Sequence, residues 1–158
     1  MKNKIILISL ISFWVDQIIK YIVYKKIINL TLIPNFLSLV YVENKGIAFS
    51  MLSGNRFLII GVSLLIIILL VYELYKSYIV NNNKNILVTI CYGILFGGIF
   101  GNLFDRLFKG YVIDYISIKA FGYLFPVFNL ADILITVGVI LMVIITIKEE
   151  KREKNVKA

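Results

Sequence analysis

Residues 86–104 read ILVTICYGILFGGIFGNLF, a run of 19 residues without a charged side chain. About 20 apolar residues are enough for a helix to cross the hydrocarbon core of a bilayer. Two other stretches are similar, because residues 57–72 carry no charge and residues 126–147 carry a single aspartate. The whole chain is 60% hydrophobic, above the roughly 45–50% of soluble proteins. These runs predict an integral membrane protein.

Residues 5–24 form a fourth apolar stretch, although it contains Asp16 and Lys20. Because its uncharged part is short and follows a basic N-terminus, a cleaved signal peptide is the alternative. No small-x-small cleavage site follows, however. Asp16 and Lys20 are four residues apart, so on a helix they share a face and neutralise each other. We therefore expect a retained first span, with spans at about 5–24, 57–75, 86–106 and 126–147.

Four alternating spans place two longer segments, residues 25–56 and 107–125, on the side of the membrane opposite both termini. Short β-prone runs occur in the first of them, on either side of Pro34 and Asn35, so a small sheet is expected there. The predicted fold class is an all-α integral membrane protein, with four transmembrane helices and a small extracytoplasmic β-rich segment after the first span. Residues 1–158 are expected to form one domain.

The net charge of +8 would suggest nucleic-acid binding in a soluble protein. Here the basic residues flank the spans, so membrane lipids are the expected partners and nucleic acid is not. Nine basic residues lie on the side of the termini and seven on the other. The positive-inside rule then predicts that both termini are cytoplasmic.

The chain has no histidine, which excludes Ser-His and Cys-His catalysis, HExxH zinc sites and histidine-ligated haem. Its single cysteine, Cys91, lies in an apolar span without an activating cation, so we expect a structural thiol. No glycine-rich phosphate loop is present. Neither a metal nor a cofactor is expected, and the remaining chemistry rests on carboxylates and amides.

All of the aspartates lie within or beside an apolar span. A charge at the bilayer centre costs about 2.5–3.5 kcal/mol on insertion scales, so such residues usually have a function. Two of them have a cation nearby, for which a salt bridge is the simpler interpretation: Asp16 with Lys20, and Asp105 with Arg106. The other two, Asp114 and Asp132, have no cation at helical spacing.

The third and fourth spans run in opposite directions, so residues 102–106 and 129–132 should lie at one level of the membrane. Asp114 follows on the connection between them, which brings it within reach of Asp132. Two adjacent carboxylates share one proton. The ionised one can then activate a water molecule while its partner hydrogen-bonds a peptide carbonyl. The pair therefore suggests an aspartic peptidase.

Five motifs resemble those of the lipoprotein signal peptidase family, also called signal peptidase II, and they occur in the same order. They are Asp16-Gln17-Ile18-Ile19-Lys20 (DQxxK), Asn44-Lys45-Gly46-Ile47-Ala48-Phe49 (NxGxAF), residues 97–106 (GGxxGNxxDR), Gly110-Tyr111-Val112-Ile113-Asp114 (GxVxD) and Phe128-Asn129-Leu130-Ala131-Asp132 (FNxAD). The resemblance extends from the first span to the last.

This resemblance implies a bacterial inner-membrane endopeptidase whose active site lies near the outer face. It implies catalytic roles for Asp114 and Asp132. The implied substrate is a prolipoprotein with a diacylglyceryl-modified cysteine, cleaved on the N-terminal side of that cysteine. Supporting or substrate-binding roles are implied for Asp16, Lys20, Asn44, Gly46, Asn102, Asp105, Arg106 and Asn129.

Two other functions are compatible with intramembrane charges. An ion-coupled transporter also uses them, but it usually shows repeats and broken helices near the midplane, which this sequence lacks. A non-enzymatic assembly subunit could use polar residues only to bind helices together. The pairing of Asp114 with Asp132 favours the peptidase.

Overall fold

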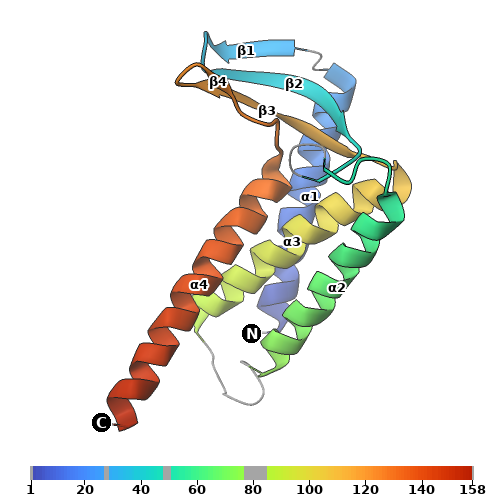
Figure 1. The fold of residues 1–158 in the computed structure, drawn as a ribbon. Coiled ribbons are helices and arrows are strands. Elements are labelled where there is room, and N and C mark those ends of the chain that lie inside the picture. The colour runs from blue at the N-terminus through green and yellow to red at the C-terminus, as the bar shows by residue number, and fades with distance from the viewer. Residues whose placement is uncertain (1, 27–28, 48–50, 77–84, 158) are drawn as a thin grey trace.

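The computed structural model describes every residue except 1, 27–28, 48–50, 77–84 and 158. Four helices dominate the fold (Figure 1): α1 (Lys2–Lys26), α2 (Arg56–Tyr75), α3 (Ile86–Phe108) and α4 (Leu130–Lys157). Each contains a stretch long and apolar enough to cross a bilayer. The prediction of a mostly helical chain with four potential membrane spans is confirmed.

Helix α3 lies at the centre of the bundle and packs against the other three helices. In its most apolar window 72% of the residues are buried, against 6% for α2. Glycines make this close packing possible. A methyl group on Gly101 would lie 2.6 Å from an Asp16 carboxylate oxygen, and one on Gly98 would lie 2.7 Å from the Ala131 carbonyl oxygen. The outer faces of the other helices remain apolar and exposed, as expected for contact with lipid.

A four-stranded antiparallel sheet lies across the end of the bundle opposite both termini (Figure 1). Its strands, in spatial order, are β1 (Asn29–Ile33), β2 (Leu37–Asn44), β3 (Val112–Ala120) and β4 (Tyr123–Leu124). The sheet was expected only in the segment after the first helix, but half of its strands come from the segment between α3 and α4. Residues 112–118 are rich in β-branched and aromatic side chains, which favour a strand.

Strand β3 positions Asp114, which we had expected on a simple connection between helices. Side chains alternate between the two faces of a strand. The neighbours Ile113 and Tyr115 pack with Val23 in a hydrophobic cluster at the end of α1. Asp114 therefore points to the opposite face and is only 2% exposed.

The start of α4 also differs from the prediction, because the helix begins at Leu130 rather than near residue 126. The backbone of Phe128 pairs with β3 instead: its carbonyl accepts hydrogen bonds from Tyr115 N at 3.0 Å and Ile116 N at 2.8 Å. Because of these hydrogen bonds, the segment before α4 joins the sheet and cannot extend the helix. Asn129 is thus left at the N-cap of α4.

Candidate active site

The aspartates at positions 114 and 132 both line one cavity of about 970 Å³. Asp114 reaches it from β3 and Asp132 from the first turn of α4. The cavity continues between α2, α3 and α4, where its lining is apolar. The two carboxylates therefore line the same cavity, as the opposite directions of the third and fourth spans led us to expect.

Asn129 holds both carboxylates in place. Its side-chain oxygen accepts a hydrogen bond from Asp132 N at 3.0 Å, and its own backbone N–H donates to Asp132 Oδ2 at 3.1 Å. This reciprocal arrangement is a capping box. The Asn129 amide donates in addition to Asp114 Oδ1 at 2.6 Å. One fully buried residue therefore fixes the separation of the two aspartates.

Asn102 links this pair to α1. Its amide nitrogen donates to Asp132 Oδ1 at 2.7 Å. Its amide oxygen accepts from Lys20 Nζ at 2.9 Å and from Asn129 Nδ2 at 3.2 Å. A buried cation donating to the amide oxygen leaves the amide N–H groups facing the carboxylate. The side chain of Asn102 is therefore held in one orientation.

A chain of buried ion pairs lies behind Asn102. Lys20 contacts Asp16 at 2.8 Å and Asp105 at 2.9 Å, and all three side chains are fully buried. Asp105 also pairs with Lys109 at 2.8 Å. Asp16 accepts a further hydrogen bond from Ala131 N at 3.1 Å, which ties α1 to the start of α4.

The predicted pairing of Asp16 with Lys20 is confirmed, but that of Asp105 with Arg106 is wrong. Adjacent residues on a helix point in different directions, so they do not face each other. Arg106 instead donates to the Gly46 carbonyl at 2.8 Å and to the Asn102 carbonyl at 3.3 Å.

Arg106 thereby holds the turn that follows β2 against α3. In this turn Asn44 Oδ1 accepts a hydrogen bond from Gly46 N at 2.9 Å, and Asn44 Nδ2 donates to Asp114 Oδ2 at 2.8 Å. Both oxygens of Asp114 therefore accept amide hydrogen bonds. Ala48 and Phe49, which complete the motif around Gly46, lie outside the described residues.

The electrostatic surroundings of Asp114 disfavour its charged form. Burial raises its pKa to about 6, the hydrogen bond from Asn44 opposes the shift, and the nearby charge of Asp132 adds to it. Asp132 differs, since it lies in the first turn of α4, where the positive end of the helix dipole favours a negative charge. The two carboxylates therefore have distinct environments.

Other groups that could carry chemistry have structural roles. Cys91 is fully buried and donates to the Gly138 carbonyl at 3.2 Å, between α3 and α4. Within the described part of the chain, no group of three or more metal-binding side chains comes together.

Sequence reasoning missed Tyr115 and the apolar lining of the cavity. The Tyr115 hydroxyl accepts a hydrogen bond from Leu130 N at 3.1 Å, which satisfies a free N–H group at the start of α4. Ile135, Val139 and Met142 line the cavity below Asp132. They follow Asp132 at helical spacings of three and four residues, a signal that the sequence did contain.

Comparisons with known proteins agree with this architecture. A family model described as signal peptidase (SPase) II matches residues 8–148. Lipoprotein signal peptidases of Staphylococcus aureus strains JH9 and Newman are each 36% identical over 157 residues, covering 96% of this chain and 94% of the relative.

Two solved structures share the fold, both of them bacterial membrane enzymes studied by the in meso method. One, at 2.3 Å resolution, has a TM-score of 0.84 and 34% identity, and the match covers 95% of this chain and 91% of that chain. The other, at 1.9 Å, has a TM-score of 0.80 and 35% identity over 92% of this chain and 94% of that chain. The fold is therefore that of an integral membrane enzyme.

The chain belongs to the lipoprotein signal peptidase (signal peptidase II) family. The resemblance carried by its five motifs is confirmed.

Proposed function

We propose that this chain is an aspartic endopeptidase that removes signal peptides from bacterial prolipoproteins, with Asp114 and Asp132 as its catalytic pair. One observation carries the proposal: the two carboxylates line a single cavity and are bridged by the buried Asn129. Curated relatives that cover nearly the whole chain are lipoprotein signal peptidases, which supports the substrate class.

The different surroundings of the two aspartates suggest their roles. We assign the proton of the pair to Asp114, whose pKa burial raises to about 6. We assign the role of base to Asp132, because it lies in the first turn of α4, where the helix dipole favours a negative charge. Asp132 takes a proton from water as the water oxygen bonds to the scissile carbonyl carbon. Asp114 gives its proton to the carbonyl oxygen, forming a neutral tetrahedral intermediate.

Collapse of this intermediate completes the reaction. The carbon–nitrogen bond breaks, the leaving amine takes the proton from Asp132, and a hydroxyl of the intermediate returns a proton to Asp114. The pair is then back in its starting state. Neither a metal nor a cofactor is required for this sequence of steps.

The cavity suits a substrate that is already embedded in the membrane. Its polar end holds the two aspartates, whereas Leu70, Ile99 and Val139 line the apolar part between the helices. A signal-peptide helix and two acyl chains could enter this part from the bilayer by lateral diffusion. We therefore propose a diacylglyceryl-modified prolipoprotein, cleaved on the N-terminal side of the lipidated cysteine.

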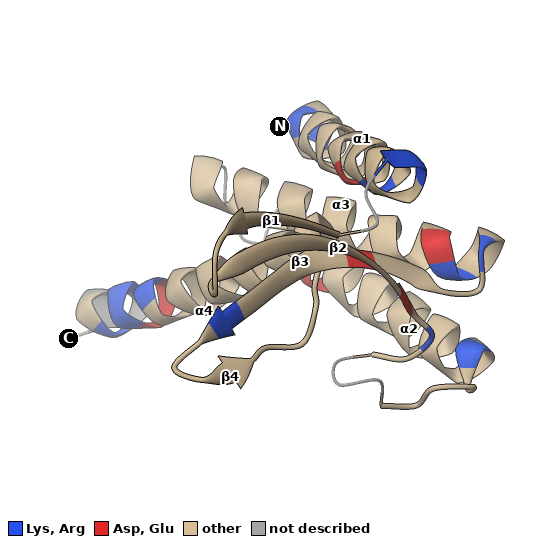
Figure 2. Cartoon of the chain, turned by 90° about the horizontal axis from the view of Figure 1, so that it is seen from above, with Lys and Arg blue, Asp and Glu red and all other residues tan. Residues whose placement is uncertain are grey.

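We propose that both termini face the cytoplasm and that the catalytic pair lies near the outer face. Nine basic residues lie on the side of both termini and seven on the other, and Figure 2 shows those at the start of α1 and in the last turns of α4. The positive-inside rule favours a cytoplasmic location for the end with both termini. The sheet and Asp114 would then lie at the outer interface.

The test is cleavage of a diacylglyceryl-modified prolipoprotein by the purified chain in detergent, with mass spectrometry of the product. We expect a new N-terminus at the lipidated cysteine and little turnover of the same prolipoprotein without diacylglyceryl. Asp114→Asn serves as the inactive control. Equal cleavage of both substrates, or a cut elsewhere, would contradict the substrate proposal.

A further inference from the structure

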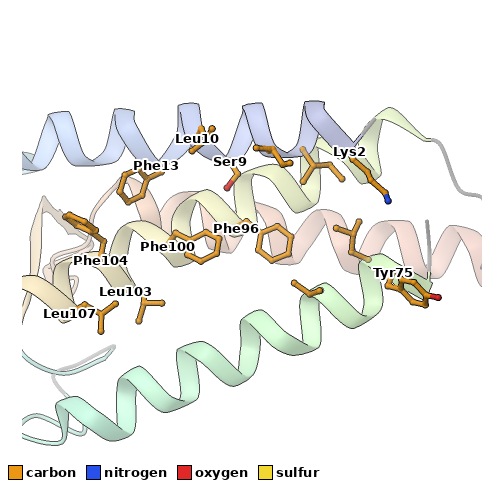
Figure 3. Close-up of a pocket in the computed structure, with 14 residues that line it drawn as sticks. Lys2, Ser9, Leu10, Phe13, Tyr75, Phe96, Phe100, Leu103, Phe104 and Leu107 are labelled. Carbon is orange, nitrogen blue, oxygen red and sulfur yellow. The ribbon is translucent and has the colours of Figure 1, made fainter. Parts of the chain in front are cut away.

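A second cavity, of about 730 Å³, lies between α1, α2 and α3. The cavity of the aspartate pair lies instead between α2, α3 and α4. Figure 3 shows aromatic rings of α1 and α3, among them Phe13, Phe96 and Phe100, along the second cavity. Among its described lining residues, only Lys2, Ser9 and Tyr75 have polar side-chain atoms. We call this space the α1–α3 cavity.

The α1–α3 cavity is suited to hydrocarbon rather than to water. A buried water molecule needs two to four polar partners. Between the two ends of the cavity, Ser9 is the only lining residue with a polar side chain in the part of the chain that the structure describes. Lys2 and Phe13 bound its α1 wall and are separated by about 16 Å at 1.5 Å per residue. This length is close to half of the roughly 30 Å hydrocarbon core, or one leaflet. An acyl chain of a membrane lipid has the required shape and polarity.

The polar groups of the α1–α3 cavity gather at one end. Figure 3 shows Lys2 and Tyr75 at this end, with Phe104 and Leu107 at the other. Lys2 belongs to the first turn of α1, and Tyr75 is the last residue of α2. A lysine near the membrane surface attracts an anionic lipid head group. The end of the cavity therefore offers a cation and a hydroxyl to a phosphate.

We propose that the α1–α3 cavity binds one anionic phospholipid of the leaflet in which α1 begins. An acyl chain lies between the three helices, and the phosphate contacts Lys2 and the Tyr75 hydroxyl. This lipid is distinct from the substrate, whose acyl chains we place in the cavity of the aspartates.

Such a lipid would support a weakly packed helix. Ile59 is the only buried residue of α2, although this helix forms walls of both cavities. Ile66 and Leu70 line the cavity of the aspartates, whereas Val71 and Leu74 line the α1–α3 cavity. A lipid filling the latter therefore supports the wall of the substrate cavity from behind.

The test is lipid binding measured by native mass spectrometry. The full chain is reconstituted in bilayers that contain equal amounts of phosphatidylglycerol and phosphatidylcholine, and it is then extracted in mild detergent. The mass of the complex identifies the bound lipid. We expect one retained lipid, with phosphatidylglycerol favoured about fivefold, as expected for one lysine at the membrane surface. Lys2→Gln should remove this preference. Lys4→Gln is the matched control, because Lys4 is exposed on α1 but does not line the cavity.

A second variant tests the position of the acyl chain. Ser9→Leu adds bulk inside the cavity and should abolish lipid retention. Protection of the Cys91 thiol from a thiol reagent verifies that the variant is folded in detergent. Retention of no lipid by the wild type would overturn the proposal. Equal preference in wild type and Lys2→Gln, or a dimer in place of the lipid-bound monomer, would also overturn it.

Discussion

Replacing Lys20 by methionine removes the only cation that contacts both Asp16 and Asp105 among the described ion pairs. All three side chains are fully buried. Removal of one partner from a buried pair costs about 3–5 kcal/mol, because the remaining charge stays desolvated. Here Asp105 keeps Lys109, and Asp16 keeps the backbone N–H of Ala131. We therefore expect a loss near the lower limit, about 3 kcal/mol.

Lys109→Met is the matched control, because Lys109 contacts the Asp105 carboxylate at 2.8 Å, against 2.9 Å for Lys20, but is 32% exposed. A partly exposed pair contributes about 0–1 kcal/mol. At roughly 2–4 °C per kcal/mol for a chain of this length, Lys20→Met should lower Tm by roughly 6–12 °C. Lys109→Met should lower it by at most roughly 4 °C.

Thermal unfolding in detergent can be followed with a thiol-reactive fluorogenic maleimide. The chain has one cysteine, and Cys91 is fully buried until α3 and α4 separate. Equal Tm values for the two variants would refute the claim that burial makes the ion pairs of Lys20 more stabilising than the exposed pair of Lys109. An unchanged Tm for Lys20→Met would refute the ion pairs themselves.

Three further predictions concern the site. Asn44→Ala removes a hydrogen bond that lowers the pKa of Asp114, so that pKa should rise above about 6. Because the proposed mechanism needs protonated Asp114, kcat/KM falls as pH rises through this pKa, and that fall should move to higher pH in the variant. An unchanged pH profile would contradict the role of Asn44 in setting the pKa of Asp114. Asn129→Ala should lower stability by about 1 kcal/mol through loss of a helix cap and also reduce kcat/KM more than tenfold. Asn85→Ala, which removes the N-cap of α3, should affect stability alone, and equal kinetic losses would argue against a positioning role for Asn129. Gly101→Ala places a methyl group 2.6 Å from a buried carboxylate oxygen of α1, so a lower Tm is expected, and an unchanged one would contradict the close packing.

Features determined by short-range rules were predictable from sequence. The lengths of the apolar runs indicated the spans, since a helix needs a fixed number of residues to cross the hydrocarbon. The pairing of Asp16 with Lys20 followed from their spacing of four residues. The convergence of Asp114 and Asp132 followed from the opposite directions of two consecutive spans.

Features that depend on tertiary contacts were not predictable. Lys20 approaches Asp105 from another helix, and no sequence spacing encodes that contact. The capping role of Asn129 depends on the pairing of Phe128 with β3, which ends the strand-like segment just before α4. The membership of β3 in the sheet depends on its pairing with β2, about 70 residues earlier in the chain.

The role of the aspartate pair can be decided by comparing initial cleavage rates of three carboxyl-to-amide variants on the same lipid-modified prolipoprotein. Glu43→Gln is the control, because Glu43 lines the same cavity. Its carboxylate accepts a hydrogen bond from the Tyr41 hydroxyl at 3.0 Å, and we assign it no role in the aspartate pair. We predict that Asp114→Asn and Asp132→Asn each lose more than 99% of the wild-type rate, at roughly the factor of 10²–10⁴ associated with general acid–base groups. Glu43→Gln should retain most of its activity. Substantial cleavage by either aspartate variant, folded to the same Tm as the wild type, would contradict the dyad.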